Sequence, residues 1–454
     1  MPATALDSNI FKDIFTTAEM RRVFSDENRT KCYLDIEAAL ARVQAKLGII
    51  PDEAVQEIVK QCRIENIDFA KLKTQTERIG YPILGVVQQI VALCKDGLGE
   101  WAHWGATTQD ITDTATVMQI REALELVEKD MEAIAAALAD LARRYRDTPM
   151  AGRSNLQQAV PITFGYKAAG LLGAMQRHRA RLAELRPRVL VGEFAGAAGT
   201  LSSLGANGLK VQEALMAKLK LGQPEIAWHT VRDRIGEVGC FLALLTSTLG
   251  KIAMDVKLLM QTEVAEVFEP FHEGRGSSST MPQKRNPVSS LYIHATASLV
   301  RANAGALLEA AVADHERSTG PWEIEWIALP EIFLLAAGCL SQSRMLVEGL
   351  EVDEARMRTN LDLTNGLVVS EAVMMGLGPI LGRQRAHDLV YDHCREALKS
   401  GRMLYDVLAD DPEIAKHMSK AELAKLTDPA NYVGLAGEMV DRVLAIEAKQ
   451  RKAS

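Results

Sequence analysis

Residues 112–146 read TDTATVMQIREALELVEKDMEAIAAALADLARRYR, and their pattern of apolar side chains decides the fold. The apolar positions are Val117, Ile120, Leu124, Val127, Met131, Ile134, Leu138 and Leu141. They recur at intervals of three and four residues, which places all of them on one stripe of an α-helix. At 1.5 Å per residue this helix is expected to be about 50 Å long, which is too long for a compact single globule.

A second apolar series predicts another long helix over residues 228–266. Its members, again three or four residues apart, are Ile235, Val238, Leu242, Leu245, Leu249, Ile252, Val256 and Leu259. Helical patterns near residues 162–189, 288–314 and 326–351 complete a bundle of five long helices. Because such stripes need apolar partners, we expect a homo-oligomer, with an elongated monomeric bundle as the alternative.

The sequence predicts an all-α protein with three helical domains. Helical patterns are shorter in the first 110 residues and again after Val352, where Gly and Pro interrupt them. Period-two alternation is almost absent, and at most residues 190–205 carry a short extended piece. The predicted domains span residues 1–111, 112–352 and 353–454.

Composition and charge exclude several classes of function. A net charge of −7 over 454 residues leaves no basic stripe for nucleic acid. The six cysteines show no metal-ligand spacing, so we expect free thiols in a reducing compartment. The chain opens without a charged-then-apolar signal segment and has no run of about 18 apolar residues. We therefore expect a cytoplasmic protein with no membrane partner.

Residues 274–288, GRGSSSTMPQKRNPV, have the composition of a mobile catalytic loop. Gly274 and Gly276 permit backbone angles that are closed to other residues. Lys284 and Asn286 bring a cation and an amide close to a run of serines, and this combination suits chemistry on a carboxylated substrate. The alternative is a Gly/Ser-rich surface linker. The MPQKRNP continuation and the helical patterns on both sides favour the catalytic interpretation.

Two further segments place polar side chains directly before a predicted helix. They are HWGATTQD at residues 103–110 and GRSNLQQAVP at residues 152–161. Free backbone donors and the helix dipole favour an anionic ligand at such positions. Helix capping is the structural alternative, and it accounts for Thr112, Asp113 and Ser154. It leaves unexplained His103, Thr107, Thr108, Gln109, Asn155 and Gln157.

Arg317, in the run HERS at residues 315–318, is another candidate. Its guanidinium group could hold a carboxylate through two hydrogen bonds. The alternative is an ion pair with Glu316 or Glu325.

Residues 278–287, SSTMPQKRNP, resemble the hallmark loop of the fumarase/aspartase superfamily. The segments at 103–110 and 152–161 fall where that superfamily has its other two conserved regions, in the same order. Three more stretches resemble the bacterial 3-carboxy-cis,cis-muconate cycloisomerases most closely. These stretches are residues 228–234, 267–270 and 315–330. The resemblance therefore covers essentially the whole chain.

This resemblance implies three mostly helical domains and a homotetramer whose core pools twenty long helices. Each active site would combine the three regions from three different subunits. Such enzymes act on small di- or tricarboxylates, and we expect neither cofactor nor metal. They remove a proton next to a carboxylate and pass through an aci-carboxylate intermediate.

The resemblance also implies roles for single residues. Ser278 would transfer the proton, while Lys284 and Asn286 would hold a substrate carboxylate and stabilise the charged intermediate. A serine acts as a base only with nearby donors and a cation. Thr107, Thr108 and Gln157 fall in the superfamily's substrate-binding regions. Together with the other candidates, the predicted substrate-binding residues are His103, Thr107, Thr108, Gln109, Ser154, Asn155, Gln157, Ser279, Met281 and Arg317.

The chain departs from the superfamily pattern at Asn155, where many of these lyases carry a histidine that protonates or orients the leaving group. An amide cannot do acid–base work near pH 7. A leaving group that needs no proton, such as the carboxylate of a lactone, therefore fits best. His103 or His229 could supply a proton if one is needed. Other departures are Ser277 in place of a glycine, and Gln158 and Gln283 where histidine is common.

We therefore expect a 3-carboxy-cis,cis-muconate cycloisomerase, in which a carboxylate adds intramolecularly to the diene and Ser278 delivers the proton. This activity would belong to the breakdown of aromatic acids through protocatechuate, the β-ketoadipate pathway. The first alternative is a β-elimination that releases fumarate from a substituted succinate. A second is a helical-bundle protein without activity, which the intact Ser278, Lys284 and Asn286 disfavour.

Overall fold

The computed structural model describes residues 3–270, 276, 280–281 and 283–453. Nineteen α-helices and four short strands lie within these described residues. The predicted all-α class is therefore confirmed.

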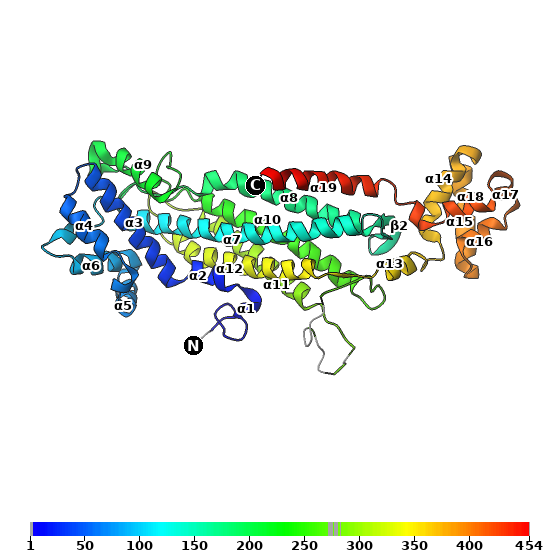
Figure 1. Ribbon diagram of the computed structural model, residues 1–454, viewed down its shortest axis with the longest axis horizontal. Helices are drawn as coiled ribbons and strands as arrows, with labels where there is room; N and C mark the ends of the chain where they lie inside the picture. The colour runs from blue at the N-terminus through cyan, green and yellow to red at the C-terminus, as the bar shows by residue number, and fades with distance from the viewer. Residues whose placement is uncertain (1–2, 271–275, 277–279, 282, 454) are drawn as a thin grey trace. The chain divides into compact units, whose positions relative to one another are not determined.

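All five predicted long helices are present (Figure 1), and their ends differ from the predicted ones by at most seven residues, the largest difference being at the end of α10. They are α7 (Thr108–Arg144), α8 (Phe164–Val189), α10 (Asp233–Leu259), α11 (Val288–Ala310) and α12 (Pro321–Glu348). Seven of the eight predicted stripe positions of α7, from Val117 to Leu138, are at most 2% exposed, and the last, Leu141, is partly buried. All eight stripe positions of α10 are buried as well. Burial of each such side chain stabilises the fold by about 1.5–3 kcal/mol.

Two of the long helices, α10 and α12, have the length and apolar composition needed to cross a membrane. Within the protein, 56% of the apolar window of α10 and 61% of that of α12 is buried. Core helices of other proteins pass the same test, so this is weak evidence for a membrane span.

The chain forms two compact units, each assembled from three separate segments. The first unit comprises Met1–Met131, His178–Gly250 and Tyr292–Gln342, and the second comprises Glu132–Arg177, Lys251–Leu291 and Ser343–Ser454. The division into three domains at residues 111 and 352 remains a prediction.

In the first unit, α3 contacts α2, α4, α6 and α9, while α5 packs on α6. Ser25 caps its first turn, because the hydroxyl accepts a hydrogen bond from the Asn28 backbone N–H (3.2 Å). Helix α3, in blue, lies beside α9, in green (Figure 1). The remaining helices and 3₁₀ turns of this unit are α1 (Lys12–Phe15), α2 (Ala18–Val23), α3 (Asp26–Lys46), α4 (Asp52–Gln61), α5 (Phe69–Ile79), α6 (Pro82–Leu93), α9 (Gly208–Leu219), η1 (Ile64–Asn66), η2 (Leu98–Trp101) and η3 (Ser202–Asn207).

In the second unit, the C-terminal helices enclose an apolar core of their own. Val373, Leu377, Leu404 and Leu408 are fully buried within it. The elements that follow the long helices are α13 (Glu354–Leu361), α14 (Ser370–Leu381), α15 (Arg383–Ser400), α16 (Leu404–Ala409), α17 (Pro412–His417), α18 (Lys420–Leu426), α19 (Ala436–Ala453), η4 (Leu367–Val369) and η5 (Pro429–Asn431).

An antiparallel hairpin of β1 (Pro149–Ser154) and β2 (Gln157–Thr163) corrects the expectation that residues 152–161 form only a turn before a helix. Burial alternates only over the first four residues of β2, and polarity does not follow it there, because Ala159 is exposed and Gln158 is partly buried. The hairpin therefore lacks the polarity signal of a strand. Gly152 lies at a register shift, and a Cβ there would come within 2.6 Å of the Val160 carbonyl oxygen.

Two other extended pieces are short. Strand β3 (Val267–Phe268) pairs antiparallel with β4 (Glu351–Val352) in the second unit. Val191 forms an isolated parallel bridge with Gly222 in the first unit, within the 190–205 stretch where the sequence allowed an extended piece.

Candidate active site

The N-terminus of α7 brings together two of the predicted substrate-binding residues. The Thr107 backbone N–H donates to Asp110 Oδ2 (2.9 Å), which fixes the first turn. The Arg317 guanidinium donates to the Thr107 hydroxyl (3.0 Å). Thr108 is the first residue of the helix. A cation and hydroxyls therefore meet at the positive end of a helix dipole, an arrangement that suits a carboxylate.

Gln109 and Asp113 are buried and belong to a network of hydrogen bonds beneath this end of α7. The Gln109 amide nitrogen donates to Asp113 Oδ2 (3.1 Å) and to the His229 carbonyl (2.8 Å). Arg232 forms a bidentate pair with Asp113 (2.7 and 3.0 Å). It also pairs with Glu325 (2.9 and 2.5 Å), so Glu325 is not the partner of Arg317 that the alternative interpretation named.

Asp110, Glu193 and His229 form a second buried cluster. His229 Nε2 lies 2.8 Å from Asp110 Oδ1. Burial opposes a charge on His229, but the neighbouring carboxylates outweigh it and raise the pKa of the ring. Burial also raises the pKa of Glu193 to about 7. Its Oε2 accepts from the Trp228 backbone N–H (2.5 Å), whereas Oε1 has no hydrogen-bond partner among the described residues.

One ligand atom from each of these three residues lies within 4.8 Å of the others, as a metal site would require. Asp110, however, already uses both carboxylate oxygens. Besides Thr107 and His229, it accepts from the backbone N–H groups of Ala195 and Gly196 (both 3.0 Å). A metal ion would have to displace these donors, so the donor set fits a hydrogen-bonded ion pair better than a metal site.

His103 lies in the loop before α7 and contacts a carboxylate that sequence reasoning missed. Its Nδ1 is 2.6 Å from Glu37 Oε1 on α3. Glu37 is 1% exposed and lies in the middle of an apolar helix face. A buried carboxylate at such a position was the available signal, because acidic residues are rarely buried without a partner.

In the second unit, the predicted residues Ser154, Asn155 and Gln157 lie at the tip of the β1–β2 hairpin. Ser154 and Gln157 are cross-strand partners. Asn155 (φ 50°) and Leu156 (φ 65°) between them are both left-handed, as a type I′ turn requires. Asparagine tolerates this conformation better than most residues, so the hairpin supplies a conformational reason for Asn155 beside the chemical one.

The hairpin is held by buried polar contacts. Arg153 forms a bidentate pair with Glu266 (2.9 and 2.7 Å), whose side chain is fully buried. The Gln158 amide donates to the Asn360 carbonyl (2.7 Å). Gln158, which stands where the superfamily commonly has histidine, therefore has a structural partner here.

The 274–288 loop is described only in part. Ser278 and Ser279 lie outside the described residues, so their predicted roles remain predictions. Lys284 and Met281 are exposed. The Asn286 amide donates to the Gly276 carbonyl (2.9 Å), which closes the base of the loop.

Glu269, which precedes this loop in the sequence, caps the N-terminus of α11, which directly follows the loop. The Glu269 carboxylate accepts from the backbone N–H groups of Ser289 (3.0 Å) and Ser290 (2.7 Å). A buried carboxylate at a helix N-terminus stabilises the helix through both hydrogen bonds and the dipole.

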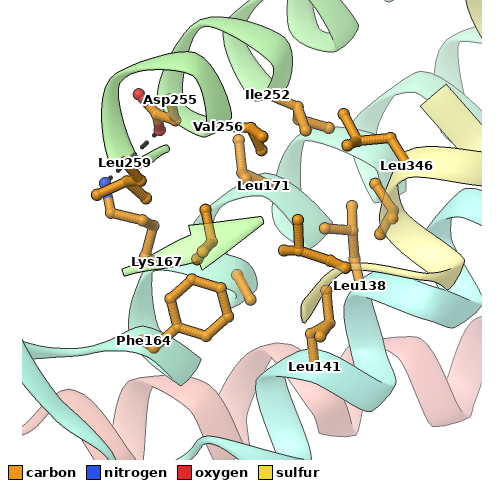
Figure 2. Close-up of a pocket in the computed structure, with 14 residues that line it drawn as sticks. Leu138, Leu141, Phe164, Lys167, Leu171, Ile252, Asp255, Val256, Leu259 and Leu346 are labelled. Atoms are coloured by element: carbon orange, nitrogen blue, oxygen red, sulfur yellow. Dashed lines mark ion pairs between the residues drawn. The ribbon is translucent and has the colours of Figure 1, made fainter. Parts of the chain in front are cut away.

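A cavity of about 30 Å³ lies within the second unit, and apolar side chains such as Leu138, Phe164 and Leu346 line it (Figure 2). Lys167 and Asp255 form an ion pair at its edge (3.6 Å). None of the predicted site residues lines it. The space holds about one water molecule, so it is a packing cavity and not a substrate site.

Comparison with known proteins identifies the family. Residues 14–301 match the family described as Lyase, and residues 366–443 match the family described as Adenylosuccinate lyase C-terminus. The chain belongs to the fumarase/aspartase superfamily of lyases. The resemblance found in the sequence is therefore confirmed.

Three relatives show how close the similarity is. Trans-aconitate decarboxylase 1 of Mycosarcoma maydis is 57% identical over 445 residues, 98% of this chain and 90% of that protein. The 3-carboxy-cis,cis-muconate cycloisomerase of Pseudomonas aeruginosa is 47% identical over 96% of both chains. The crystal structure of the 3-carboxy-cis,cis-muconate lactonizing enzyme from Pseudomonas putida is 43% identical, with a TM-score of 0.93 over 97% of this chain and 99% of that one.

Proposed function

We propose that this lyase removes CO2 from a small unsaturated tricarboxylate without a cofactor, and that trans-aconitate is the first substrate to test. The observation that carries the proposal is the 57% identity to a trans-aconitate decarboxylase, which extends over 98% of this chain. Identity to the cycloisomerase of Pseudomonas aeruginosa is lower, at 47%.

This decarboxylation would pass through an aci-carboxylate, the kind of negatively charged intermediate that the superfamily resemblance implies. In trans-aconitate one carboxylate is attached to the CH2 group next to the double bond. When the C–C bond to this carboxylate breaks, CO2 leaves and the electron pair forms a new terminal double bond. The electrons of the old double bond move onto the carbon beside another carboxylate, where they give an aci-carboxylate. A proton delivered to that carbon yields 2-methylidenesuccinate.

Residues of the predicted site supply the groups that this sequence of bond changes needs. Thr107, Thr108 and Arg317 would bind one carboxylate at the N-terminus of α7. Lys284 and Asn286 would stabilise the aci-carboxylate, because fixed cationic and amide donors lower the energy of developing negative charge. Ser278 would deliver the proton, as the superfamily resemblance implies.

Asn155 supports this assignment because CO2 departs as a neutral molecule. A leaving group that takes no proton needs no acid at the hairpin tip, where other lyases of the superfamily carry histidine. The same argument disfavours a departing amine.

Lactonisation of 3-carboxy-cis,cis-muconate, expected from the sequence, is the second candidate. The 47% and 43% identities to enzymes with this name favour it. There a substrate carboxylate adds to the diene, and the resulting aci-carboxylate again takes a proton from Ser278. Both candidates therefore use an unsaturated tricarboxylate and pass through the same kind of intermediate, an aci-carboxylate.

We also propose a cytoplasmic homotetramer of three-domain subunits with active sites shared between three of them. Apolar side chains exposed on the long helices support the assembly. Leu299 (54%), Leu308 (51%) and Ile327 (67%) would be covered by neighbouring subunits.

The experiment that tests the function mixes the purified protein with trans-aconitate and measures released CO2 and 2-methylidenesuccinate in equal amounts. A parallel reaction follows the ultraviolet absorbance of the 3-carboxymuconate diene. Loss of the diene without CO2 release from trans-aconitate would favour the second candidate, and no change in either reaction would overturn both. Ser278→Ala should abolish the observed reaction while the protein stays folded.

A further inference from the structure

A short contact between Glu37 and His103 links α3, in the core of the first unit, to the loop that precedes α7. Nδ1 of His103 and Oε1 of Glu37 are 2.6 Å apart, the distance of a charge-assisted hydrogen bond. The Glu37 side chain is 1% exposed and the His103 side chain 18%. One ring nitrogen therefore faces the buried Glu37 carboxylate, and part of the ring surface is accessible to solvent.

Among the described residues, His103 is the only hydrogen-bond partner of the Glu37 carboxylate. Its second oxygen, Oε2, is buried without a partner there. Such a desolvated carboxylate is costly unless it faces a donor that can carry positive charge. The imidazole ring is that donor, since Nδ1–H donates to Oε1 in both the charged ring and one neutral tautomer.

Helix α3 fixes the backbone of the same loop through a second side chain. The Gln44 amide donates to the Trp104 carbonyl (2.7 Å). Glu37 and Gln44 are seven residues apart, so they lie on one face of α3 two turns from each other. His103 itself adopts a left-handed conformation (φ 59°), which is uncommon for a residue other than glycine, and the two contacts lie at this residue and the next.

The outer nitrogen of the ring, Nε2, has no hydrogen-bond partner in the described part of the chain. Four residues further along, the Thr107 hydroxyl accepts from Arg317. His103 and Thr107 belong to the same short loop that leads into the N-terminus of α7.

We propose that Glu37 is a positioning residue that holds His103 as a charged donor, so that Nε2–H binds a carboxylate of the substrate. This proposal deepens the proposed function and rests on it for the identity of the substrate. It assigns to α3, a helix outside the three sequence regions of the superfamily, a part in setting substrate affinity.

The pH dependence follows from the groups around the ring. Burial opposes the charge on His103, but Glu37 on α3 and, more weakly, Asp110 on α7 outweigh it and raise its pKa above 6.5. Cys62, at the end of α4 near Glu37, stays a neutral thiol because burial raises its pKa. Below this raised pKa the ring is charged and Nε2 carries the proton that it donates. As pH rises through the pKa, Nε2 loses this proton and can no longer donate.

The test measures the dissociation constants of propane-1,2,3-tricarboxylate and fumarate by calorimetry from pH 6 to 9 on the full-length protein. In the wild type, affinity should fall about tenfold as pH rises, the effect of one charged hydrogen bond. In Glu37→Gln the same loss should occur at lower pH. In His103→Gln the affinity should be weak and independent of pH in this range.

Gln44→Ala is the matched control, because it loosens the loop without changing the charge on His103. It should weaken binding while the midpoint of the pH dependence stays where it is in the wild type. An unchanged midpoint in Glu37→Gln, or no binding of either probe at any pH, would overturn the role of Glu37. If the midpoint shifts but trans-aconitate is not turned over, the positioning role stands and the proposed substrate falls.

Discussion

The guanidinium of Arg153 and the carboxylate of Glu266 form two hydrogen bonds, of 2.9 and 2.7 Å, in the second unit, where the carboxylate is fully buried and the arginine side chain is 23% exposed. Glu266 also accepts from the Asn360 amide (2.8 Å). Through this pair the hairpin that carries Ser154, Asn155 and Gln157 is tied, next to its tip, to the segment before β3. The position of the hairpin tip therefore depends on one ion pair whose carboxylate is buried.

Replacing Arg153 with Met should lower the free energy of unfolding by about 2–3 kcal/mol, because it removes the counter-charge of the buried Glu266 carboxylate and leaves it only the Asn360 amide. The thermal unfolding midpoint measures this. The double variant Arg153→Met/Glu266→Gln should recover most of the loss. Arg143→Ala is the control, since Arg143 and Asp140 form an exposed pair (62% and 77%) whose removal should cost less than about 0.5 kcal/mol. Equal effects of the two arginine changes would contradict the prediction.

Leu156 combines a left-handed backbone (φ 65°) with a side chain that is 76% exposed. Leu156→Gly should relieve strain and raise stability by about 1 kcal/mol, which a higher unfolding midpoint would show. Leu156→Ala is the comparison, because it removes the side chain but keeps the strain. If the alanine variant gains as much as the glycine variant, backbone strain is not the cause.

Glu193 should make stability depend on pH, because burial raises its pKa to about 7 from an ordinary value of 4.5. Below about pH 4.5 the carboxyl is neutral in the folded and the unfolded chain. Between these values only the unfolded chain releases the proton, so the contribution of Glu193 to stability falls as pH rises. Glu193→Gln removes this loss.

The difference in unfolding midpoint, Glu193→Gln minus wild type, should therefore rise from pH 5 to 7 and level off above pH 8. Thermal unfolding in a buffer series measures it. A difference that stays flat across this range would show that Glu193 is ionised in the folded protein throughout.

The planar guanidinium group of Arg317 should be needed for substrate affinity, because it can donate two parallel hydrogen bonds to a carboxylate. Arg317→Lys keeps the charge but loses the paired donors, one of which binds Thr107 at 3.0 Å. We expect KM for the tricarboxylate to rise at least about tenfold with a smaller change in kcat, the loss of one charged hydrogen bond. Steady-state kinetics test this, with Arg301→Lys on α11 as the control. A KM equal to that of the wild type would remove Arg317 from the binding site.

The long helices and their buried stripes were predictable because the information is local. Val117 to Leu138 on α7 and Ile235 to Leu259 on α10 repeat at helical spacing, and each stripe is apolar enough that burial is its only stable outcome. The loop signature also needed no tertiary structure, since adjacent residues carry it. The superfamily was predictable from the sequence for that reason.

The β1–β2 hairpin was not predictable in this way. Its strands place Gln158 inward and Ala159 outward, so polarity does not follow burial, and tertiary contacts such as Gln158 with Asn360 override the local pattern. The local sequence showed an asparagine where a histidine was expected, and only the left-handed angles of Asn155 and Leu156 supplied a conformational reason for it.

The sequence by itself determined the helical class, the position of the five long helices and the superfamily, because periodicity and contiguous motifs survive without a folded chain. The tertiary structure decided which polar groups meet. His103 contacts Glu37, which is 66 residues away in sequence, and Arg232 contacts Asp113, which is 119 residues away. Such pairs form because a buried charge needs a partner, and the packing of the helices determines which groups are close enough. The local sequence contains no pattern that predicts these pairs.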